Sequence, residues 1–353
     1  MNLIETIEIK NFKSIRHQKI EGCKRINVFI GYPNVGKSNI LEALSLFSIN
    51  ETSIQYFSSF VRMEDLTTLF FNGNVEAGLE VRVNDLHRYV AKYLPDRLSF
   101  ERQYTKDKSR YDDSNGLLKE NDQGIDRVKS FGIIEKNQNI VDYASFPFES
   151  TIGSILSEIK EYTFKKNISY TSNRYDSLSF PFGENIFAII SGHPEIKKEI
   201  ESLFPVYNLE LVFDTRERKF AILKRTSSGI FSIPYELLAD TLQRLIFYKA
   251  AILSNTESVL LFEEPEAHMF PPYVSKFASD VWFNKSNQYF ITTHSPFVIN
   301  DFLENSRDEL AIFIVDYEKE NGETRIKKMT DQEMHDAYQY GLDLFFNIKS
   351  FVD

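Results

Sequence analysis

An eight-residue motif close to the N-terminus constrains this chain of 353 residues more than any other feature. Residues 31–38 read Gly-Tyr-Pro-Asn-Val-Gly-Lys-Ser and match the pattern G-x-x-x-x-G-K-[ST] at every fixed position. The apolar run at 26–30 predicts a strand before the motif, and apolar residues at helical spacing between 40 and 47 predict a helix after it. A strand, a glycine-bounded loop and a helix in this order predict a site for the phosphates of a nucleoside triphosphate.

The fixed residues of the motif each have a chemical reason. The two glycines allow successive backbone N–H groups to turn toward phosphate oxygens, and the helix that follows adds its N-terminal dipole. Lys37 supplies a positive charge to the β and γ phosphates, and the hydroxyl of Ser38 is a ligand for Mg²⁺. We expect nucleotide contacts from the loop and the residue after it: Gly31, Tyr32, Pro33, Asn34, Val35, Gly36, Lys37, Ser38 and Asn39.

Two further apolar runs end in polar side chains that suit the same chemistry. Residues 258–262 predict a strand followed by Glu263 and Glu264, and residues 288–292 predict a strand followed closely by His294. We expect the first of these strands to lie beside the strand of the phosphate loop. Neighbouring side chains of a strand point in opposite directions, so Glu263 is expected to hold Mg²⁺ and Glu264 to orient and deprotonate the attacking water.

His294 is expected to hydrogen-bond the γ phosphate or the attacking water. Taken alone, each of the two strand ends fits a structural role as well as a catalytic one. The order of the three elements favours a single ATPase site.

These motifs resemble those of ABC-type ATPases of the RecF/SMC/OLD-like branch. Residues 31–38 are similar to the Walker A motif, residues 260–268 (Leu-Leu-Phe-Glu-Glu-Pro-Glu-Ala-His) to Walker B, and residues 292–296 (Thr-Thr-His-Ser-Pro) to the switch-histidine segment. The resemblance covers residues 3–48 and about 230–300. It implies ATP and Mg²⁺ as cofactors and a head-to-head dimer, or a higher oligomer, in which two copies sandwich ATP.

The resemblance also implies nucleotide contacts from three further segments, and in this sequence the residues of these segments depart from the family pattern or match it only in part. A basic residue of the N-terminal segment, Lys13 or Arg16, is expected near the nucleotide. The L-S-x-G signature should fall near residues 235–244, but neither its serine nor its glycine is present there. Asp240, Thr241 and Gln243 are expected to substitute for them as polar donors or acceptors at a helix start, with Asp240 as the N-cap. Gln55 is the candidate for the Q-loop glutamine.

Alternating strands and helices predict an α/β fold: a P-loop NTPase with an ABC-type head, in which a mixed sheet adjoins an antiparallel β lobe. We expect the N-terminal half of the head at 1–82 and an inserted, mainly helical or lid region at 83–205. The C-terminal half, with the signature-like segment, Walker B and the switch histidine, is expected at 206–353. Helical spacing at 152–159 and 196–204 underlies the prediction for the insertion.

The composition limits which partners and which cellular compartment we expect for this protein. The net charge of −10 argues against a protein whose main task is to coat DNA or an anionic membrane. A single cysteine, Cys23, excludes an internal disulfide and a Cys-rich zinc module. Because the sequence has no apolar run of about 20 residues, we expect a cytoplasmic protein with no membrane partner.

Three functions stay open. The leading one is an ATP-hydrolysing regulatory or sensor subunit whose output lies in a separate effector such as a nuclease, as in bacterial anti-phage systems such as PARIS. It follows from the resemblance and from the lack of a D-x-D metal cluster after residue 296. One alternative is a RecF-like DNA-binding repair ATPase, which the acidic charge disfavours. The other is an ATP-dependent scaffold with little turnover, which a general base at Glu264 disfavours.

Overall fold

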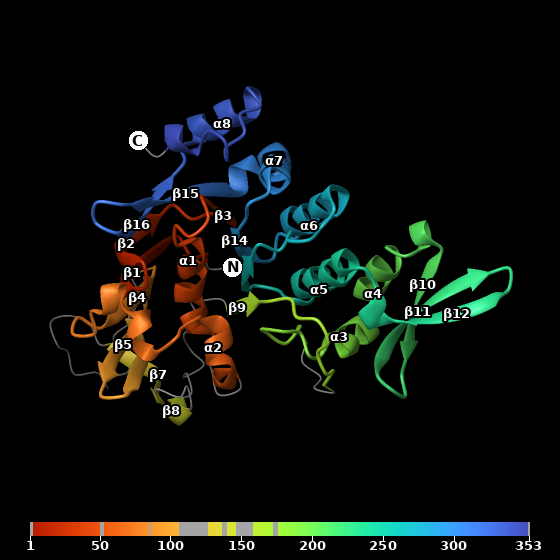
Figure 1. The fold of residues 1–353 in the computed structure, drawn as a ribbon, viewed down its shortest axis with the longest axis horizontal. Helices are drawn as coiled ribbons and strands as arrows, with labels where there is room; N and C mark the ends of the chain where they lie inside the picture. Colours follow the sequence, from red (N-terminus) through yellow and green to blue (C-terminus); the bar gives the residue numbers. More distant parts are fainter. Residues whose placement is uncertain are drawn as a thin grey trace, which may run out of the picture.

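The computed structural model describes residues 3–49, 53–84, 86–105, 126–135, 140–145, 158–171 and 176–351. Within these residues the chain forms a six-stranded mixed sheet, a seven-stranded antiparallel sheet and a three-stranded antiparallel sheet, with helices around the first (Figure 1). No helix in the described residues has both the length and the apolar character that crossing a membrane requires.

The mixed sheet carries the three strands that the motifs predict. In spatial order its strands are β16 (Glu323–Lys328), β15 (Leu310–Glu318), β3 (Ile26–Ile30), β14 (Gln288–Thr292), β13 (Val259–Glu263) and β9 (Ile159–Tyr162). All neighbours pair in parallel except β15 and β16. The carboxyl ends of β3, β13 and β14 therefore meet at one edge of the sheet. Every residue of β3 and β14 is buried, as expected for parallel strands covered on both faces.

One sequence-based expectation about this sheet is wrong. We expected the strand that ends in Glu263 to lie directly beside the strand of the phosphate loop. Instead β14 lies between β3 and β13, pairing with both. The sequence does not show which strand lies beside β3, because all three strands are five residues long and almost wholly buried, so each suits a central position of the sheet.

The antiparallel sheet covers one face of the mixed sheet. In spatial order its strands are β2 (Ile15–Glu21), β1 (Thr6–Phe12), β4 (Leu79–Val83), β5 (His87–Leu94), β6 (Arg97–Thr105), β7 (Asp126–Glu135) and β8 (Ile140–Ser145). Ile7 and Ile9 point to its inner face and are fully buried. They share one apolar core with helix α1 (Lys37–Ser45) and with Phe29 and Leu261 of the mixed sheet. Helix α1 is thus fixed between the two sheets.

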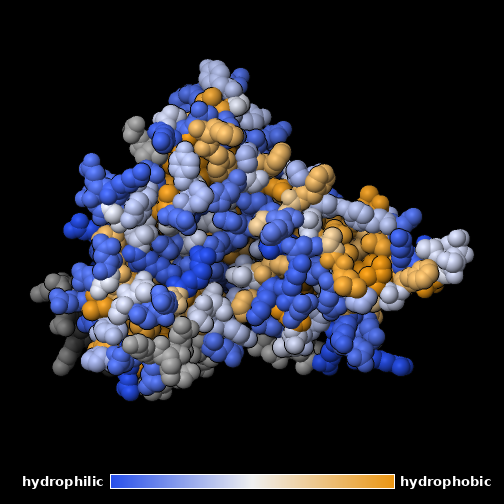
Figure 2. All heavy atoms as spheres, in the orientation of Figure 1, coloured by the Kyte–Doolittle hydropathy of each residue, from blue (hydrophilic) through white to orange (hydrophobic). Residues whose placement is uncertain are grey.

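Helices cover the opposite face. They are α3 (Ile186–Gly192), α4 (Pro194–Glu201), α5 (Asp240–Ser254), α6 (Pro271–Phe283), α7 (Pro296–Asn305) and α8 (Asp331–Gln339). The short helix α2 (Phe57–Phe60) packs instead into the apolar core between the two sheets. The third sheet, β10 (Leu209–Asp214), β11 (Lys219–Thr226) and β12 (Gly229–Pro234), projects beyond α4 (Figure 1). Hydrophobic side chains gather near α4 and the base of this sheet on the face shown in Figure 2.

The segment 83–205 differs from the expected helical insertion. It carries strands β5 to β9 before its two helices, and β5 to β8 extend the antiparallel sheet. Ile159, part of a helical spacing in the sequence, begins strand β9, whereas residues 150–157 lie outside the described residues. In β5 the buried residues His87, Tyr89 and Ala91 alternate with exposed or half-exposed ones. The pattern is hard to recognise because one buried position holds a histidine and another an alanine.

Candidate nucleotide-binding site

The loop between β3 and α1 is pressed against strands β15 and β16, and both of its glycines are required. A Cβ on Gly31 would lie closer than 3.0 Å to the carbonyl oxygen of Val315. A Cβ on Gly36 would lie closer than 3.0 Å to the hydroxyls of Thr324 and Ser14. Gly36 is the N-cap of α1 and has φ 99°, which only glycine adopts readily. The loop therefore ends at the start of a helix, as a phosphate site requires.

Lys37 crosses the loop instead of extending into solvent. Its Nζ donates hydrogen bonds to the carbonyl oxygens of Gly31, at 3.0 Å, and Tyr32, at 2.8 Å. Burial lowers the pKa of Lys37 to about 8, although the carboxylates of Glu264 and Glu263 act in the opposite direction. The ammonium is held over the loop, where phosphate oxygens would approach it.

The other loop positions divide into exposed and buried ones. Tyr32, Pro33 and Asn34 are exposed, whereas Val35 is buried and its carbonyl accepts a hydrogen bond from Thr324. Asn39 donates its side-chain amide to the hydroxyl of Ser14 at 2.7 Å. Asn39 therefore links α1 to the turn between β1 and β2.

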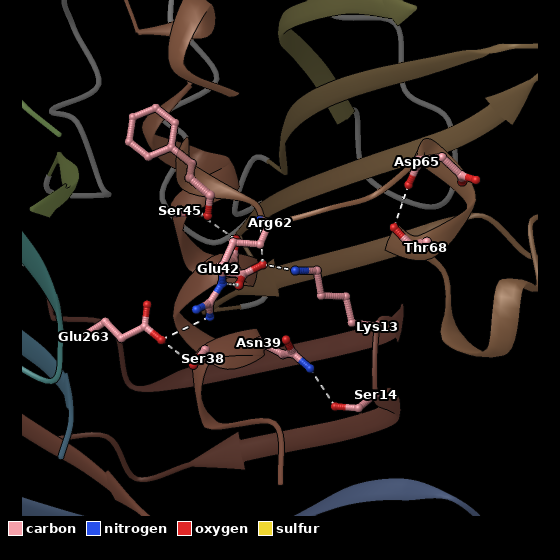
Figure 3. Close-up of polar contacts among 11 residues, drawn as sticks. Lys13, Ser14, Ser38, Asn39, Glu42, Ser45, Arg62, Asp65, Thr68 and Glu263 are labelled. Atoms are coloured by element: carbon pink, nitrogen blue, oxygen red, sulfur yellow. Dashed lines mark hydrogen bonds and ion pairs between the residues drawn. The ribbon is translucent and has the colours of Figure 1, made fainter. Parts of the chain in front are cut away.

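Ser38 and Glu263, both expected at Mg²⁺, are in direct contact, since the hydroxyl donates a hydrogen bond to the carboxylate (Figure 3). A hydroxyl and a carboxylate are ligands that suit Mg²⁺, which prefers oxygen and needs few protein ligands beside phosphates and water. In the described part of the chain, no group of three or more His, Cys, Asp or Glu side chains is placed to hold a metal. The pair fits a metal held largely by the nucleotide.

Arg62 adjoins this pair, and the motifs did not identify it. Its Nε donates to Glu42 at 2.8 Å and its guanidinium reaches Glu263 at 3.0 Å (Figure 3). Burial opposes the charge, but Glu263 and Glu42 outweigh it and raise the pKa of Arg62. Glu42 is buried on α1, one helical turn beyond Ser38, and also accepts a hydrogen bond from Lys13. Glu42 was missed because a single glutamate within a helix carries no motif.

Lys13 lies in the turn after β1, close to helix α1. It pairs with Glu42, and its side chain is largely buried. Burial lowers its pKa, with the carboxylate of Glu42 acting against that change. Gln55, on the short 3-10 helix Ile54–Tyr56, is exposed.

Glu264 and His294 face each other across the ends of β13 and β14. Glu264 has φ 42°, so the chain turns out of the strand at this residue, and its N–H bonds to the carbonyl of Thr292 at 3.0 Å. The carboxylate lies 3.3 Å from Nε2 of His294. Burial and the nearby charge of Lys37 lower the pKa of His294, while Glu264 acts to raise it. The two side chains remain partly exposed, as groups that receive a ligand must be.

Asp240 and Thr241 have other partners than the residues of this cluster. The expectation that Asp240 is the N-cap of its helix is wrong: Ala239 is the N-cap and Asp240 is the first helical residue. The Asp240 carboxylate pairs instead with Arg244 and Lys166, each at 3.0 Å. The hydroxyl of Thr241 donates to the carbonyl of His268 at 2.8 Å, which ties the start of α5 to the loop after β13.

The fold and the motifs at the sheet edge define an ABC-type ATPase of the RecF/SMC branch. The chain belongs to the family described as "AAA domain, putative AbiEii toxin, Type IV TA system", whose model matches residues 26–300. Membership of this family implies that the chain binds ATP.

Similar proteins match over short segments. A Methanocaldococcus jannaschii protein described as uncharacterized is 45% identical over 99 residues, 25% of this chain and 44% of that protein. A Helicobacter pylori "ATP/GTP phosphatase" is 48% identical over 42 residues, 12% and 11% of the two chains. The "DNA replication and repair protein RecF" of a Thermoanaerobacter species is 39% identical over 49 residues, 14% of each chain. The matches therefore span less than half the length of these relatives.

Solved structures with a related arrangement are heads of SMC proteins. One is an SMC head bound to the C-terminal winged-helix domain of ScpA, at a TM-score of 0.48 and 15% identity, covering 93% of this chain and 97% of that one. Another is the SMC head domain of Thermotoga maritima, at a TM-score of 0.42 and 14% identity, covering 93% and 99%.

Proposed function

We propose that this protein binds ATP with Mg²⁺ and hydrolyses it to ADP and phosphate. The observation that supports this most strongly is the meeting of Lys37, Ser38, Glu263, Glu264 and His294 at one edge of the mixed sheet. Bound Mg²⁺ would neutralise charge on the phosphates.

The protein groups have separate tasks in this proposal. Lys37 and the N–H groups at the start of α1 hold the phosphates, and Ser38 and Glu263 hold the metal. Glu264, half-exposed at the sheet edge, orients a water molecule and accepts its proton. His294, beside Glu264, hydrogen-bonds the γ phosphate or the same water.

The test is phosphate release from ATP by the purified chain, with Lys37→Ala as the blank. We expect turnover that depends on Mg²⁺ and falls to the level of the blank when the metal is chelated. Turnover equal to that of Lys37→Ala, with ATP bound normally, contradicts hydrolysis and favours the scaffold that binds ATP without using it.

Self-association belongs to the same proposal. In a head-to-head dimer, the start of α5 would approach the nucleotide of the other copy, with Asp240 and Thr241 at that position. Glu264→Gln, which is expected to keep ATP bound, should form a dimer with ATP and not without it. Size-exclusion chromatography with light scattering measures this, and Lys37→Ala should stay monomeric in both conditions.

We further propose that the chain acts as the nucleotide-dependent regulatory or sensor subunit of a multi-protein system, with a separately encoded effector such as a nuclease. The family description names a toxin of a type IV toxin–antitoxin system, which supports a setting of more than one protein. Bacterial anti-phage defence is the setting we favour. Cleavage of nucleic acid by the purified chain alone contradicts the proposal of a separate effector.

A RecF-like repair ATPase is the second candidate, supported by the matched RecF segment. It predicts turnover that duplex DNA stimulates and that added salt reduces, because phosphate contacts release counterions. The regulatory role predicts turnover indifferent to DNA. Measuring phosphate release with and without duplex DNA at two salt concentrations separates the two.

A further inference from the structure

Glu266 is a buried carboxylate for which the ATPase motifs provide no task. It follows Glu264 by two positions in the loop after β13, and only 9% of it is exposed. Its Oε1 accepts two hydrogen bonds, from the hydroxyl of Thr293 at 2.5 Å and from the main-chain N–H of His294 at 3.0 Å. Both donors belong to the segment that leaves β14.

These hydrogen bonds continue the connection between β13 and β14 beyond the end of the strands. The last paired residues of the two strands are Glu263 and Thr292. At Glu264 the backbone turns away with φ 42°, so regular pairing stops where the two catalytic side chains begin. The side chain of Glu266 then connects the two segments at the next position. The hydrogen bonds of Glu266 therefore join the two segments beside Glu264 and His294, where regular strand pairing has ended.

The same contact reaches the start of the following helix. The hydroxyl of Thr293, which donates to Glu266, accepts a hydrogen bond from the N–H of Ser295 at 3.0 Å. Ser295 is the N-cap of α7. The main chain on both sides of His294 is thus held by one network centred on Glu266, while the imidazole faces Glu264 and stays partly exposed.

Packing alone does not account for a carboxylate at this position. Burial raises the pKa of Glu266, although Thr293 and the main-chain N–H of His294 act against the change. Within the described residues, its second oxygen, Oε2, is buried without a hydrogen-bond partner. A buried polar atom without a partner costs stability, so an apolar residue would suit packing better.

We propose that Glu266 is a positioning residue that sets the place of His294 relative to Glu264 by accepting hydrogen bonds from Thr293 and from the main chain of His294. The inference rests on the proposed ATPase function. In this proposal Glu266 acts through the segment 293–295, by way of its hydrogen bonds from Thr293 and His294.

Three variants test the proposal. Glu266→Gln keeps an acceptor oxygen and can retain both hydrogen bonds, Glu266→Ala removes both, and Thr293→Val removes one. We expect all three to bind a fluorescent ATP analogue within about twofold of the unmodified chain, because Lys37 and the loop are untouched. We expect kcat to fall by about 10- to 100-fold in Glu266→Ala with KM nearly unchanged, since small displacements of reacting groups have effects of this size.

The conservative variant supplies the control. Glu266→Gln should retain kcat within about threefold, because hydrogen-bond acceptance and not charge is what positions His294. Hydrogen exchange provides a readout without turnover: a peptide covering residues 289–297 should lose protection in Glu266→Ala and keep it in Glu266→Gln. Should Glu266→Ala fail to fold, Thr293→Val is compared with Glu266→Gln in the same two measurements, with a smaller loss expected.

Two results overturn the proposal. One is a folded Glu266→Ala, or Thr293→Val in its place, with unchanged kcat and unchanged protection of the peptide. The other is a Glu266→Gln as impaired as Glu266→Ala, which would show that charge is what matters. Failure of the proposed ATPase function can be told apart from failure of this proposal. If the unmodified chain shows no turnover above Lys37→Ala, the hydrogen-exchange measurement still tests whether Glu266 holds the segment.

Discussion

The hydroxyl of Ser38 donates a hydrogen bond to the carboxylate of Glu263, and the two residues lie 225 positions apart in the chain. Ser38 is in the first turn of α1 and Glu263 is the last residue of β13, so the contact joins the phosphate loop to a strand two places away in the sheet. Arg62, from a third segment of the chain, donates a hydrogen bond to the same carboxylate. The two expected metal ligands are therefore already adjacent, and a guanidinium shares one of them.

Arg62 should compete with Mg²⁺ for Glu263. In Arg62→Ala the carboxylate loses its cation, so we expect half-saturation of ATP binding at an Mg²⁺ concentration about two- to fivefold lower, the range for a partly exposed ion pair. Binding of ATP in the presence of a chelator should weaken, because an unpaired Glu263 repels the phosphates. Titrating a fluorescent ATP analogue with and without Mg²⁺ measures both effects.

Arg62→Lys is the matched control, since it keeps a positive charge near Glu263 but cannot bridge Glu42 and Glu263 with a planar fork. Its Mg²⁺ requirement should lie between those of the unmodified chain and Arg62→Ala. A higher Mg²⁺ requirement in Arg62→Ala would show that Arg62 supports metal binding instead.

Glu264→Gln should separate binding from hydrolysis. The amide cannot accept a proton, so we expect turnover to fall about 100-fold or more, the usual range for loss of a general base. ATP binding should be retained, because Lys37 and Ser38 are unchanged. Phosphate release and analogue binding are measured on the same samples. Glu257→Gln, an exposed glutamate just before the opposite end of β13, is the control and should leave both quantities unchanged. Normal turnover in Glu264→Gln would place the base elsewhere.

The sequence was sufficient to predict the parts of the site that depend on local pattern. The strand–loop–helix unit around Gly36 and the polar ends of β13 and β14 follow from short runs of residues, and the structure has strands and a helix there. Arg62 could not be predicted, because its partner Glu263 lies 201 positions away and no motif links the two segments.

The order of the strands in the mixed sheet could not be predicted from the sequence either. Three apolar strands of five residues each give no local signal for which one lies beside β3. The place of β14 follows from how crossover helices pack, which is a property of the whole chain. For Asp240 the residue type misled the prediction, since its carboxylate pairs with Arg244 one turn on instead of capping the helix.

His294 should titrate below the usual range of histidine, because burial and the positive charge of Lys37 both lower its pKa. Removing the positive charge in Lys37→Ala should raise the pKa of His294, and removing the carboxylate in Glu264→Gln should lower it further. An NMR titration of the ring proton signals checks both directions. A pKa that moves the same way in both variants contradicts the arrangement of these three groups.

Gly36→Ala should destabilise the fold itself. The new Cβ would lie closer than 3.0 Å to the hydroxyls of Ser14 and Thr324, and these cannot move away freely because they are hydrogen-bonded to each other at 2.6 Å. The backbone would also have to keep φ 99°, which alanine disfavours. We expect the free energy of unfolding to fall by about 2 kcal/mol or more, from strain and clash together. The midpoint of urea unfolding measures the change.

Gly192→Ala is the matched control for this prediction. Gly192 ends helix α3 and has nothing within 4 Å of an added Cβ. Alanine there should leave stability unchanged or raise it by up to about 1 kcal/mol, since alanine favours a helix more than glycine does. Equal urea midpoints for the two variants would mean that the loop shifts at little cost. In that case the contact of Gly36 with β16 would not be what holds the phosphate loop in place.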